Sequence, residues 1–510
     1  MEWKKYLRRP EGAAAASAFL CGLLVHCFGL VNMLHNYDSI IVNPQGYGVG
    51  VASGRWFLTV LGDLVQRVTG NYNLSWFNGV VFIALVSLSA AVLVGTLGVP
   101  VGKMTGALIG MILVSFPTST SVLFFPYAAG YHGVALLLSI TAAWALLHGG
   151  KTGFVGSIFC IAMSMGIYQA YLPVTVSIVV LALLIQTLRE NVTFRQIFCK
   201  GLYCCLNIAL GVGLYFAAVE LSLSFYRVEL HSYQGIDTMG QISIAELPGL
   251  IVAAVKGFCL LPLRDYCQLA SLPVLKAGYL LAGIVSIALI CTTLISRRKK
   301  LPVIIMTGLL CAIFPLAVNL IVVMCPNSHI YTLMVYPFAV ALCMPLALYE
   351  AQPEMNKWKP AARKTTTAIL LAVIMGNAYV ANVNYTGLYY ANRQTENYLN
   401  AMVAQVRMTE GYDSEKEWAF VGDNVRDPAL SNGWNNAIRI GGNTTAGGLI
   451  NAYSREAWIE FFLGCRFPMA WPETVEVLKT NEEVLQMPCW PAQGSIKVIG
   501  DQVVIKLEQP

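Results

Sequence analysis

The sequence predicts a polytopic α-helical membrane protein that ends in a small α/β unit outside the membrane. Hydrophobic residues make up 56% of the 510 residues and charged residues only 12%, about half the ~25% of a soluble domain. Apolar runs of about 20 residues recur, and a helix needs that length to cross a bilayer. Eleven runs are predicted to span the membrane: 12–33, 74–97, 104–125, 130–147, 153–170, 171–188, 201–225, 277–296, 301–324, 330–349 and 365–386.

Three features of the membrane part depart from simple spans. The fifth and sixth spans come from one uncharged run, which we divide near Tyr168 to Pro173 because proline interrupts a helix. Residues 55–68 have apolar side chains at helical spacing, which predicts an amphipathic helix along the membrane surface. Residues 244–263 are apolar enough to dip into the interface or to re-enter the bilayer.

Lysine and arginine predict the orientation, because they concentrate in short cytoplasmic loops. About half of the basic residues lie at the N-terminus or in alternate short loops, as in Arg297-Arg298-Lys299-Lys300. This pattern puts the N-terminus in the cytoplasm, and an odd number of spans puts the C-terminus outside. The first apolar run is too long for a typical signal peptide, so we expect it to be retained. The net charge of +6 mostly reflects these loops, and without a basic stripe carrying interleaved aromatics we expect no nucleic-acid binding.

The predicted organisation is a transmembrane domain, 1–386, with outer loops 34–73 and 226–276, followed by an extracytoplasmic α/β domain, 387–510. In the second domain we expect four elements: a helix over 388–408, a strand over 418–422, a helix over 474–485, and a hairpin of strands 495–499 and 502–507 around Gly500-Asp501. Cys465 and Cys489 fall outside the membrane, where a disulfide and two free thiols are both open. No cysteine or histidine spacing suggests zinc.

The stretch Asn36-Tyr37-Asp38, with Arg55-Trp56 after it, is the candidate catalytic region. It follows the first span, so a carboxylate and a cation lie at a membrane surface. Sugar transfer from a lipid phosphate to a hydroxyl needs a base, and one carboxylate suffices for an inverting displacement because the phosphate leaves already charged. Burial near the interface would raise the basicity of Asp38. The alternative for Asp38 is a turn or helix-cap role.

Several cations are candidates for binding the substrate. Arg55 can hold a phosphate with two donors, and Trp56 can stack on a sugar or anchor in the interface. In the second outer loop, Arg227, Glu229 and His231 alternate, and Arg264 follows. They form either a substrate site, with Arg227, His231 or Arg264 as a phosphate clamp, or a solvated surface. Four residues at span ends could line one cavity, although histidines there are more often hydrogen-bonded interface residues: Tyr131, His132, His329 and Tyr331.

Asn36-Tyr37-Asp38 and Gly54-Arg55-Trp56, together with the many spans and the outer C-terminal unit, resemble the Gtr type II glucosyltransferases that modify bacterial O-antigen and related surface polysaccharides. Such enzymes look like members of the GT-C superfamily. The resemblance implies a GT-C-like fold, with Asp38 as catalytic base or metal-binding residue.

The resemblance also implies an undecaprenyl-phosphate-glucose donor, supplied by a separate synthase and flippase, and a surface-glycan acceptor at the bacterial plasma membrane. One departure is that residues 126–133 lack the second acidic residue of many GT-C enzymes. Either Glu229, Asp237 or Asp265 replaces it, or one carboxylate is enough. A divalent metal is therefore possible but not required.

Two alternatives remain from the sequence. A transporter or flippase for a lipid-linked sugar would share the composition. However, transporters place ionisable groups at the midplane, and the predicted spans here are nearly free of charge. A GT-C transferase for another sugar, or for an acceptor such as teichoic acid, would share every feature above.

Overall fold

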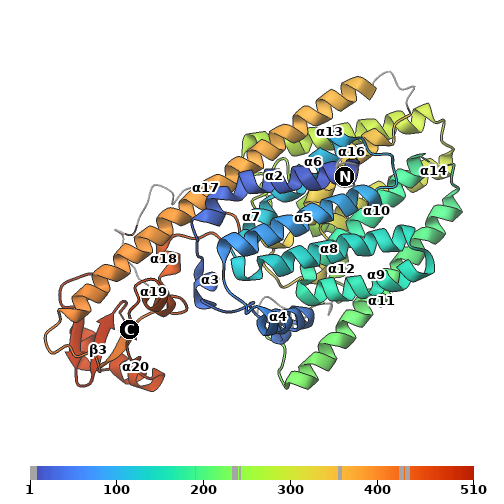
Figure 1. Cartoon of the computed structure of the whole chain (residues 1–510). Coiled ribbons are helices and arrows are strands. Elements are labelled where there is room, and N and C mark those ends of the chain that lie inside the picture. Colours follow the sequence, from blue (N-terminus) through green and yellow to red (C-terminus); the bar gives the residue numbers. More distant parts are fainter. Residues whose placement is uncertain are drawn as a thin grey trace.

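The computed structural model describes residues 9–189, 191–232, 239, 243–353, 359–423, 430 and 437–509. It consists of a helical bundle and a smaller C-terminal unit, joined by the long helix α17 (Lys359–Arg407) (Figure 1). Apart from α17, the bundle contains these helices: α2 (Pro10–Val31), α5 (Ser75–Thr96), α6 (Lys103–Ser115), α7 (Pro117–Leu123), α8 (Pro126–His148), α9 (Gly150–Ile167), α10 (Leu172–Arg189), α11 (Phe194–Tyr226), α12 (Leu247–Cys259), α13 (Pro273–Ser296), α14 (Leu301–Val318), α15 (Ile321–Met324) and α16 (Pro337–Glu350).

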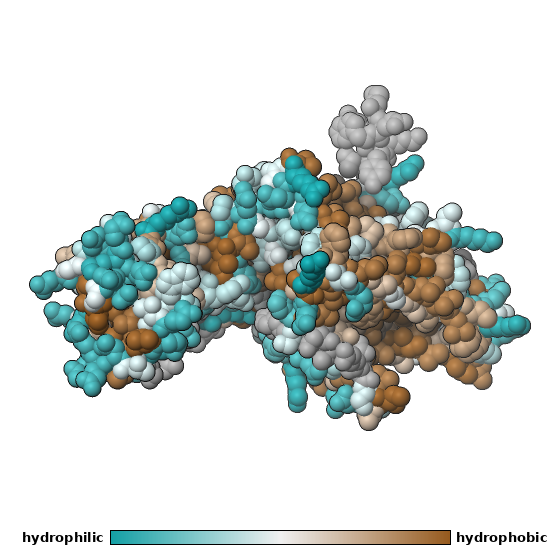
Figure 2. All heavy atoms as spheres, turned by 90° about the horizontal axis from the view of Figure 1, so that it is seen from below, coloured by the Kyte–Doolittle hydropathy of each residue, from teal (hydrophilic) through white to brown (hydrophobic). Residues whose placement is uncertain are grey.

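The bundle is that of a multi-pass membrane protein. In the described part of the chain, nine helices are long and apolar enough to cross a bilayer, and each coincides with a predicted span. The bundle presents a broad apolar surface, whereas the C-terminal unit is mostly hydrophilic (Figure 2). The remaining two predicted spans are the bent pair α6–α7 and the 14-residue helix α16, so the full number of crossings stays a prediction.

Two chain breaks interrupt the bundle at the end that faces the C-terminal unit. Helices α6 and α7 meet at 45°, because a residue before proline avoids the helical conformation and Phe116, before Pro117, is extended. Helix α9 ends at extended Tyr168, and the short 3-10 helix η2 (Gln169–Tyr171) precedes α10. The predicted division near Tyr168 to Pro173 is thus confirmed.

The first outer loop contains α3 (Tyr37–Ile41), the 3-10 turn η1 (Val51–Ser53) and α4 (Trp56–Val68). Helix α4 is the predicted amphipathic helix. It packs on α9, and Val60, Leu64 and Val68 on its apolar side remain exposed. In the second outer segment, α12 is the apolar helix expected within 244–263.

Helix α17 carries the chain from the bundle into the C-terminal unit. Its 49 residues extend about 74 Å, far longer than the roughly 30 Å of hydrocarbon. The predicted helix 388–408 is therefore the distal part of α17, and the proposed boundary between 386 and 387 falls inside a continuous helix. Because no flexible linker intervenes, the C-terminal unit is held at a fixed distance from the bundle.

The C-terminal unit contains one three-stranded sheet in the order β1-β3-β2. Strand β1 (Glu417–Val421) pairs parallel with β3 (Gln502–Lys506), which pairs antiparallel with β2 (Ile496–Ile499), so the predicted strand and hairpin are confirmed. Four short helices complete the unit: α18 (Ala446–Leu449), α19 (Arg455–Phe461), α20 (Pro472–Lys479) and α21 (Glu482–Gln486). The single helix predicted over 474–485 is wrong, because Asn481 starts a new helix by accepting hydrogen bonds from the Glu483 and Val484 amides.

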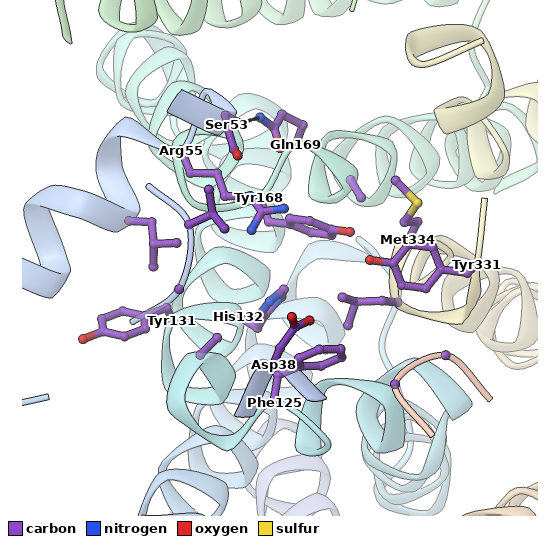
Figure 3. Close-up of a pocket in the computed structure, with 18 of the residues that line it drawn as sticks. Asp38, Ser53, Arg55, Phe125, Tyr131, His132, Tyr168, Gln169, Tyr331 and Met334 are labelled. Carbon is purple, nitrogen blue, oxygen red and sulfur yellow. Dashed lines mark hydrogen bonds between the residues drawn. The ribbon is translucent and has the colours of Figure 1, made fainter. Parts of the chain in front are cut away.

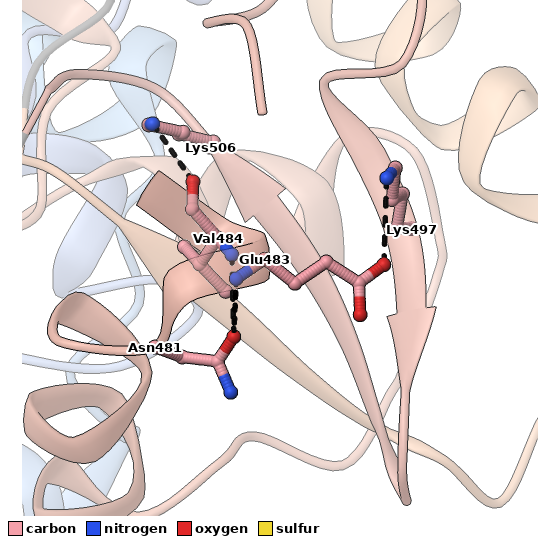
Figure 4. A network of polar contacts seen from close by, with 5 residues as sticks. All are labelled: Asn481, Glu483, Val484, Lys497 and Lys506. Atoms are coloured by element: carbon pink, nitrogen blue, oxygen red, sulfur yellow. Dashed lines mark hydrogen bonds and ion pairs between the residues drawn. The ribbon is translucent and has the colours of Figure 1, made fainter. Parts of the chain in front are cut away.

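A fully buried lysine stabilises this unit (Figure 4). The Lys506 ammonium in β3 donates to the carbonyls of Val484, Leu485 and Met487 at distances of 2.8, 2.9 and 2.8 Å. These carbonyls lie at the C-terminal end of α21, where backbone acceptors lack helical partners and a positive charge is favoured. The lysine therefore joins the sheet to α21.

We expect Lys506→Met to loosen the C-terminal unit by about 2–3 kcal/mol, because three buried carbonyls lose their donor. Hydrogen–deuterium exchange of the detergent-solubilised protein should show faster exchange in β3 and α21. Lys497→Met is the matched control: Lys497 makes only a surface ion pair with Glu483 at 3.4 Å, so its loss should change exchange little. Equal exchange in the two variants would contradict the stabilising role of Lys506.

Candidate active site

A cavity of about 1070 Å³ lies at the end of the bundle that faces the C-terminal unit. Segments far apart in the sequence form its wall: α3, the turn before α4, the start of α8, η2, the segment around 321–334, and the C-terminal residues 439–443. Asp38, His132 and Arg55 point into this space (Figure 3). The cavity is thus lined mainly by loops and helix ends, whose side chains are not all needed for packing between helices.

Asp38 lies in the first turn of α3, and its helix is capped by another residue. The Asn36 side chain accepts a 2.7 Å hydrogen bond from the Ser39 amide, and the Ser39 hydroxyl accepts one of 2.9 Å from the Asn36 amide. This capping box satisfies the helix N-terminus and leaves the Asp38 carboxylate facing the cavity. Among the described residues, Asp38 is the only carboxylate in the lining.

The electrostatic environment of Asp38 favours a base of increased strength. Burial raises the pKa of the Asp38 carboxyl above its ordinary value, while a hydrogen bond from Tyr453 and the charge of Arg55 lower it. Within the described residues, Asp38 and Arg55 form no ion pair. The two charges therefore share one cavity without neutralising each other through direct contact.

Arg55 is positioned by a tight turn. Gly54 has a positive φ of 68°, a conformation that favours glycine. Two side chains hold this turn: Gln169 donates to the Ser53 carbonyl at 2.8 Å, and the Tyr215 hydroxyl donates to the Gly54 carbonyl at 3.2 Å. The Arg55 guanidinium lies 5.0 Å from the centre of the Tyr168 ring, and its buried Nε has no hydrogen-bond partner in the described chain. The site therefore offers a cation with unused donor capacity.

Aromatic side chains and histidines form much of the remaining wall. Tyr131, His132, His329 and Tyr331 all line the cavity, which is the less favoured of the two interpretations that the sequence left open. The His132 ring lies 5.0 Å from the Tyr168 ring and 3.2 Å, Nδ1 to Oη, from Tyr171. Aromatic rings with polar edges suit a sugar, which presents both apolar C–H faces and hydroxyls.

Sequence reasoning named no site residue in the C-terminal unit, although it expected this unit to cover the cavity. Arg439, Gly441, Gly442, Asn443 and Tyr453 line the cavity. Gly442 has a φ of 94°, and a Cβ there would lie 2.9 Å from the Phe125 ring, so glycine allows this close approach. The only sequence signal was the pair Gly441-Gly442 beside an arginine, which does not reveal its distant neighbours.

The other predicted site residues divide into two groups. Tyr37 lines the cavity, whereas Asn36 is fully buried as the cap of α3. Trp56 packs closely on Gly166 of α9 and does not line the cavity.

The four candidates of the second outer loop are exposed and lie outside the lining: Arg227, Glu229, His231 and Arg264. Of the three acids considered as a second carboxylate, Glu229 is in this group, Asp265 also lies outside the lining, and Asp237 is outside the described residues. The only carboxylate that the structure brings to Arg55 in the described cavity wall is thus Asp38.

The donor set gives a metal no obvious site in the described residues. No three side chains of histidine, cysteine, aspartate or glutamate gather there in a way that could hold an ion. Cys465 and Cys489 are both free thiols. We therefore derive the chemistry from the carboxylate and the arginines.

A multi-pass bundle with a charged, aromatic-lined cavity at one end has the form of a membrane enzyme acting on a polar group near the bilayer. Comparison with known families gives its class: the sequence model of the family described as glucosyl transferase GtrII matches residues 27–342, more than half of the chain. The chain belongs to this family and is a glycosyltransferase, as the sequence resemblance predicted. No curated protein and no solved structure matches it. The matched residues include Asp38 and Arg55 but end before α17 and the C-terminal unit.

We expect Gly54→Ala to reduce glucosyl transfer about tenfold. A non-glycine residue in this conformation costs about 1–3 kcal/mol, and its Cβ would lie 2.7 Å from the Tyr215 hydroxyl, so Arg55 would shift. Gly213→Ala in α11 is the control, since nothing lies within 4 Å of a Cβ there. Transfer assays on membranes with matched protein levels test this, and equal activity of the two variants would show that the turn does not position Arg55.

Proposed function

We propose that this enzyme transfers glucose from a polyprenyl-phosphate-glucose donor to a surface polysaccharide on the outer side of the bacterial plasma membrane, with inversion at the anomeric carbon. The observation that carries the proposal is the Asp38 carboxylate opposite Arg55 in the aromatic-lined cavity. The N-terminus would be cytoplasmic and the C-terminal unit extracytoplasmic. The fold would be GT-C-like, with a separate synthase and flippase supplying the donor.

Asp38 acts as the general base. It takes the proton of the acceptor hydroxyl, whose oxygen attacks the anomeric carbon from the face opposite the phosphate. The bond between that carbon and the phosphate oxygen breaks, and its electron pair stays on the polyprenyl phosphate, which needs little protonation to leave. Burial, which raises the pKa of Asp38, supports this role because a stronger base accepts the proton more readily.

Arg55 and Arg439 bind the donor phosphate. Both line the cavity, and arginine can present two parallel donors to phosphate oxygens. This assignment replaces Arg227 and Arg264 of the second outer loop, which are exposed and outside the lining. The positive charges of Arg55 and Arg439 also stabilise the phosphate as it departs.

The polyprenyl chain leaves the cavity along its apolar wall. Ile321, Leu333, Met334 and Met239 supply apolar side chains to the lining. The transporter alternative loses support, because family membership identifies an enzyme. A different sugar or a teichoic-acid acceptor would use the same base and clamp, so transfer assays with several donors decide between them.

We expect Asp38→Asn to lower transfer about 10²–10⁴-fold, the usual contribution of a general base, while donor binding is retained. The assay follows radiolabelled glucose from polyprenyl-phosphate-glucose into polysaccharide in isolated membranes. Asp63→Asn in α4 is the matched control, because Asp63 accepts a hydrogen bond from Tyr47 in the same outer loop but does not line the cavity. Near-normal activity of Asp38→Asn would move the base elsewhere.

Arg55→Ala and Arg439→Ala should each raise the KM for the donor about 10- to 100-fold, because hydrogen bonds to a charged phosphate are worth about 1.5–3 kcal/mol. Arg55→Lys should recover only part of the loss, since lysine keeps the charge without the two-point geometry. Arg227→Ala serves as the control and should leave KM unchanged. A raised donor KM in Arg227→Ala, with unchanged KM in Arg55→Ala and Arg439→Ala, would show instead that the second outer loop binds the phosphate.

A further inference from the structure

Tyr453 is a residue of the C-terminal unit that contacts the candidate base, Asp38. It lines the cavity beside Asp38, and its hydroxyl makes a hydrogen bond to the Asp38 carboxylate. Tyr453 lies outside the residues that match the family model. A hydrogen bond to a carboxylate restricts its orientation.

Local structure fixes where Tyr453 emerges from the C-terminal unit. The Asn451 side chain accepts hydrogen bonds from the Tyr453 and Ser454 amides at 2.9 and 3.1 Å, and it donates to the Gly448 carbonyl at 2.8 Å. The Ser454 hydroxyl also bonds to the Leu449 carbonyl. This turn leads directly into α19, so the Tyr453 backbone is ordered on both sides.

Helix α19, which follows Tyr453, packs against α3, which carries Asp38, and against His35 just before α3. The buried His35 ring, just before α3, lies 6.4 Å from the Trp458 ring and 5.1 Å from the Phe462 ring at α19. Asn392 of α17 bonds to the amide and carbonyl of His35, both at 2.8 Å. Asp38 is three residues beyond His35 and Tyr453 two residues before α19, so this contact fixes the distance between them.

The segment that precedes Tyr453 is also tied to the bundle. The Asn384 carboxamide of α17 accepts hydrogen bonds from the Ile440 amide at 3.0 Å and from Asn443 Nδ2 at 2.7 Å. Ser121 of α7 donates to the Gly441 carbonyl at 2.6 Å, and the Gly441 amide donates to the Thr332 hydroxyl at 3.1 Å. Three separate parts of the bundle therefore hold the segment that completes the cavity.

We infer that Tyr453 is a positioning residue for the reaction: its hydroxyl orients the Asp38 carboxylate, so that the C-terminal unit completes the active site. The inference rests on the proposed role of Asp38 as base. A hydrogen bond to the charged form of a carboxylate stabilises that form and opposes the effect of burial. The other charged or titratable side chains that line the same cavity are Arg55, Arg439, His132, His329, Cys325, Tyr37, Tyr47, Tyr127, Tyr131, Tyr168 and Tyr331.

The test is the pH dependence of kcat for Tyr453→Phe with polyprenyl-phosphate-glucose as the probe. A base works when deprotonated, so activity falls as the pH drops through the pKa of Asp38. Without the hydroxyl the charged form loses stabilisation, and this acidic limb should move upward by about one pH unit. Activity on the limb should fall about tenfold, and most of it should return at higher pH with an unchanged donor KM. Tyr398→Phe in α17 is the control, because Tyr398 packs on Trp490 at 6.1 Å and does not line the cavity.

A purely structural role would lower the plateau of kcat without moving the limb, and that result would overturn the inference. Tyr453→Gln, which restores an N–H donor, should bring the limb back toward its wild-type position; a limb that stays displaced in this variant would also count against it. Asp38→Asn measured in parallel separates the two proposals. If Asp38→Asn is inactive but Tyr453→Phe leaves the limb in place, only the role of Tyr453 fails; if Asp38→Asn is active, the proposed base itself fails.

Discussion

The buried side chain of Asn384 is the contact on which the composition of the cavity depends. Its oxygen accepts two hydrogen bonds from the segment around Ile440 and Asn443, and its nitrogen donates to the Val380 carbonyl within α17. The amide thus uses its donor and acceptor capacity in an apolar setting, where an unsatisfied polar group is costly. These hydrogen bonds fix the position of the segment on the bundle. As a result Arg439 lines the cavity, and so does Tyr453 in the turn that follows.

The cavity lies among helices that end or break. Helix α7 starts after the extended Phe116, α9 ends at Ile167, and α14 ends at Val318. In a membrane protein, irregular backbone is tolerated where it is buried in protein or lines a cavity. Side chains donate hydrogen bonds to backbone carbonyls in this region: Thr118 donates to the Thr332 carbonyl at 2.7 Å, and Asn319 donates to the Ala254 carbonyl at 3.0 Å. The breaks are therefore compatible with a stable bundle, and they open room for a ligand.

The charges in the cavity fit a reaction at a phosphate-linked carbon. Asp38 and Arg55 lie on different walls, held by the capping box of Asn36 and by the turn at Gly54. Neither position relies on an ion pair between them, so a phosphate can approach the arginine without first breaking a salt bridge. Residues 439–443 and Tyr453 of the C-terminal unit supply the remaining part of the lining.

The sequence by itself determined the membrane class, nine of the spanning helices, the break after Tyr168, the amphipathic α4, the final hairpin and the family. These features depend on local periodicity, on proline and on turn residues, all of which can be read within one short stretch of sequence. It also singled out Asp38 and Arg55, because an acid and an arginine are conspicuous between apolar runs. It did not divide α20 from α21, since one Asn481 side chain ends a pattern that otherwise continues as a helix.

Only the tertiary structure decided which cations share the cavity. The sequence singled out Arg227 and Arg264 but not Arg439, yet of these three only Arg439 lines the cavity wall. The physical reason is that their positions depend on contacts across long sequence separations, such as those of Asn384 with Asn443 and of His35 with Trp458. Such contacts form from packing and hydrogen-bond satisfaction in the folded protein, and no local pattern records them.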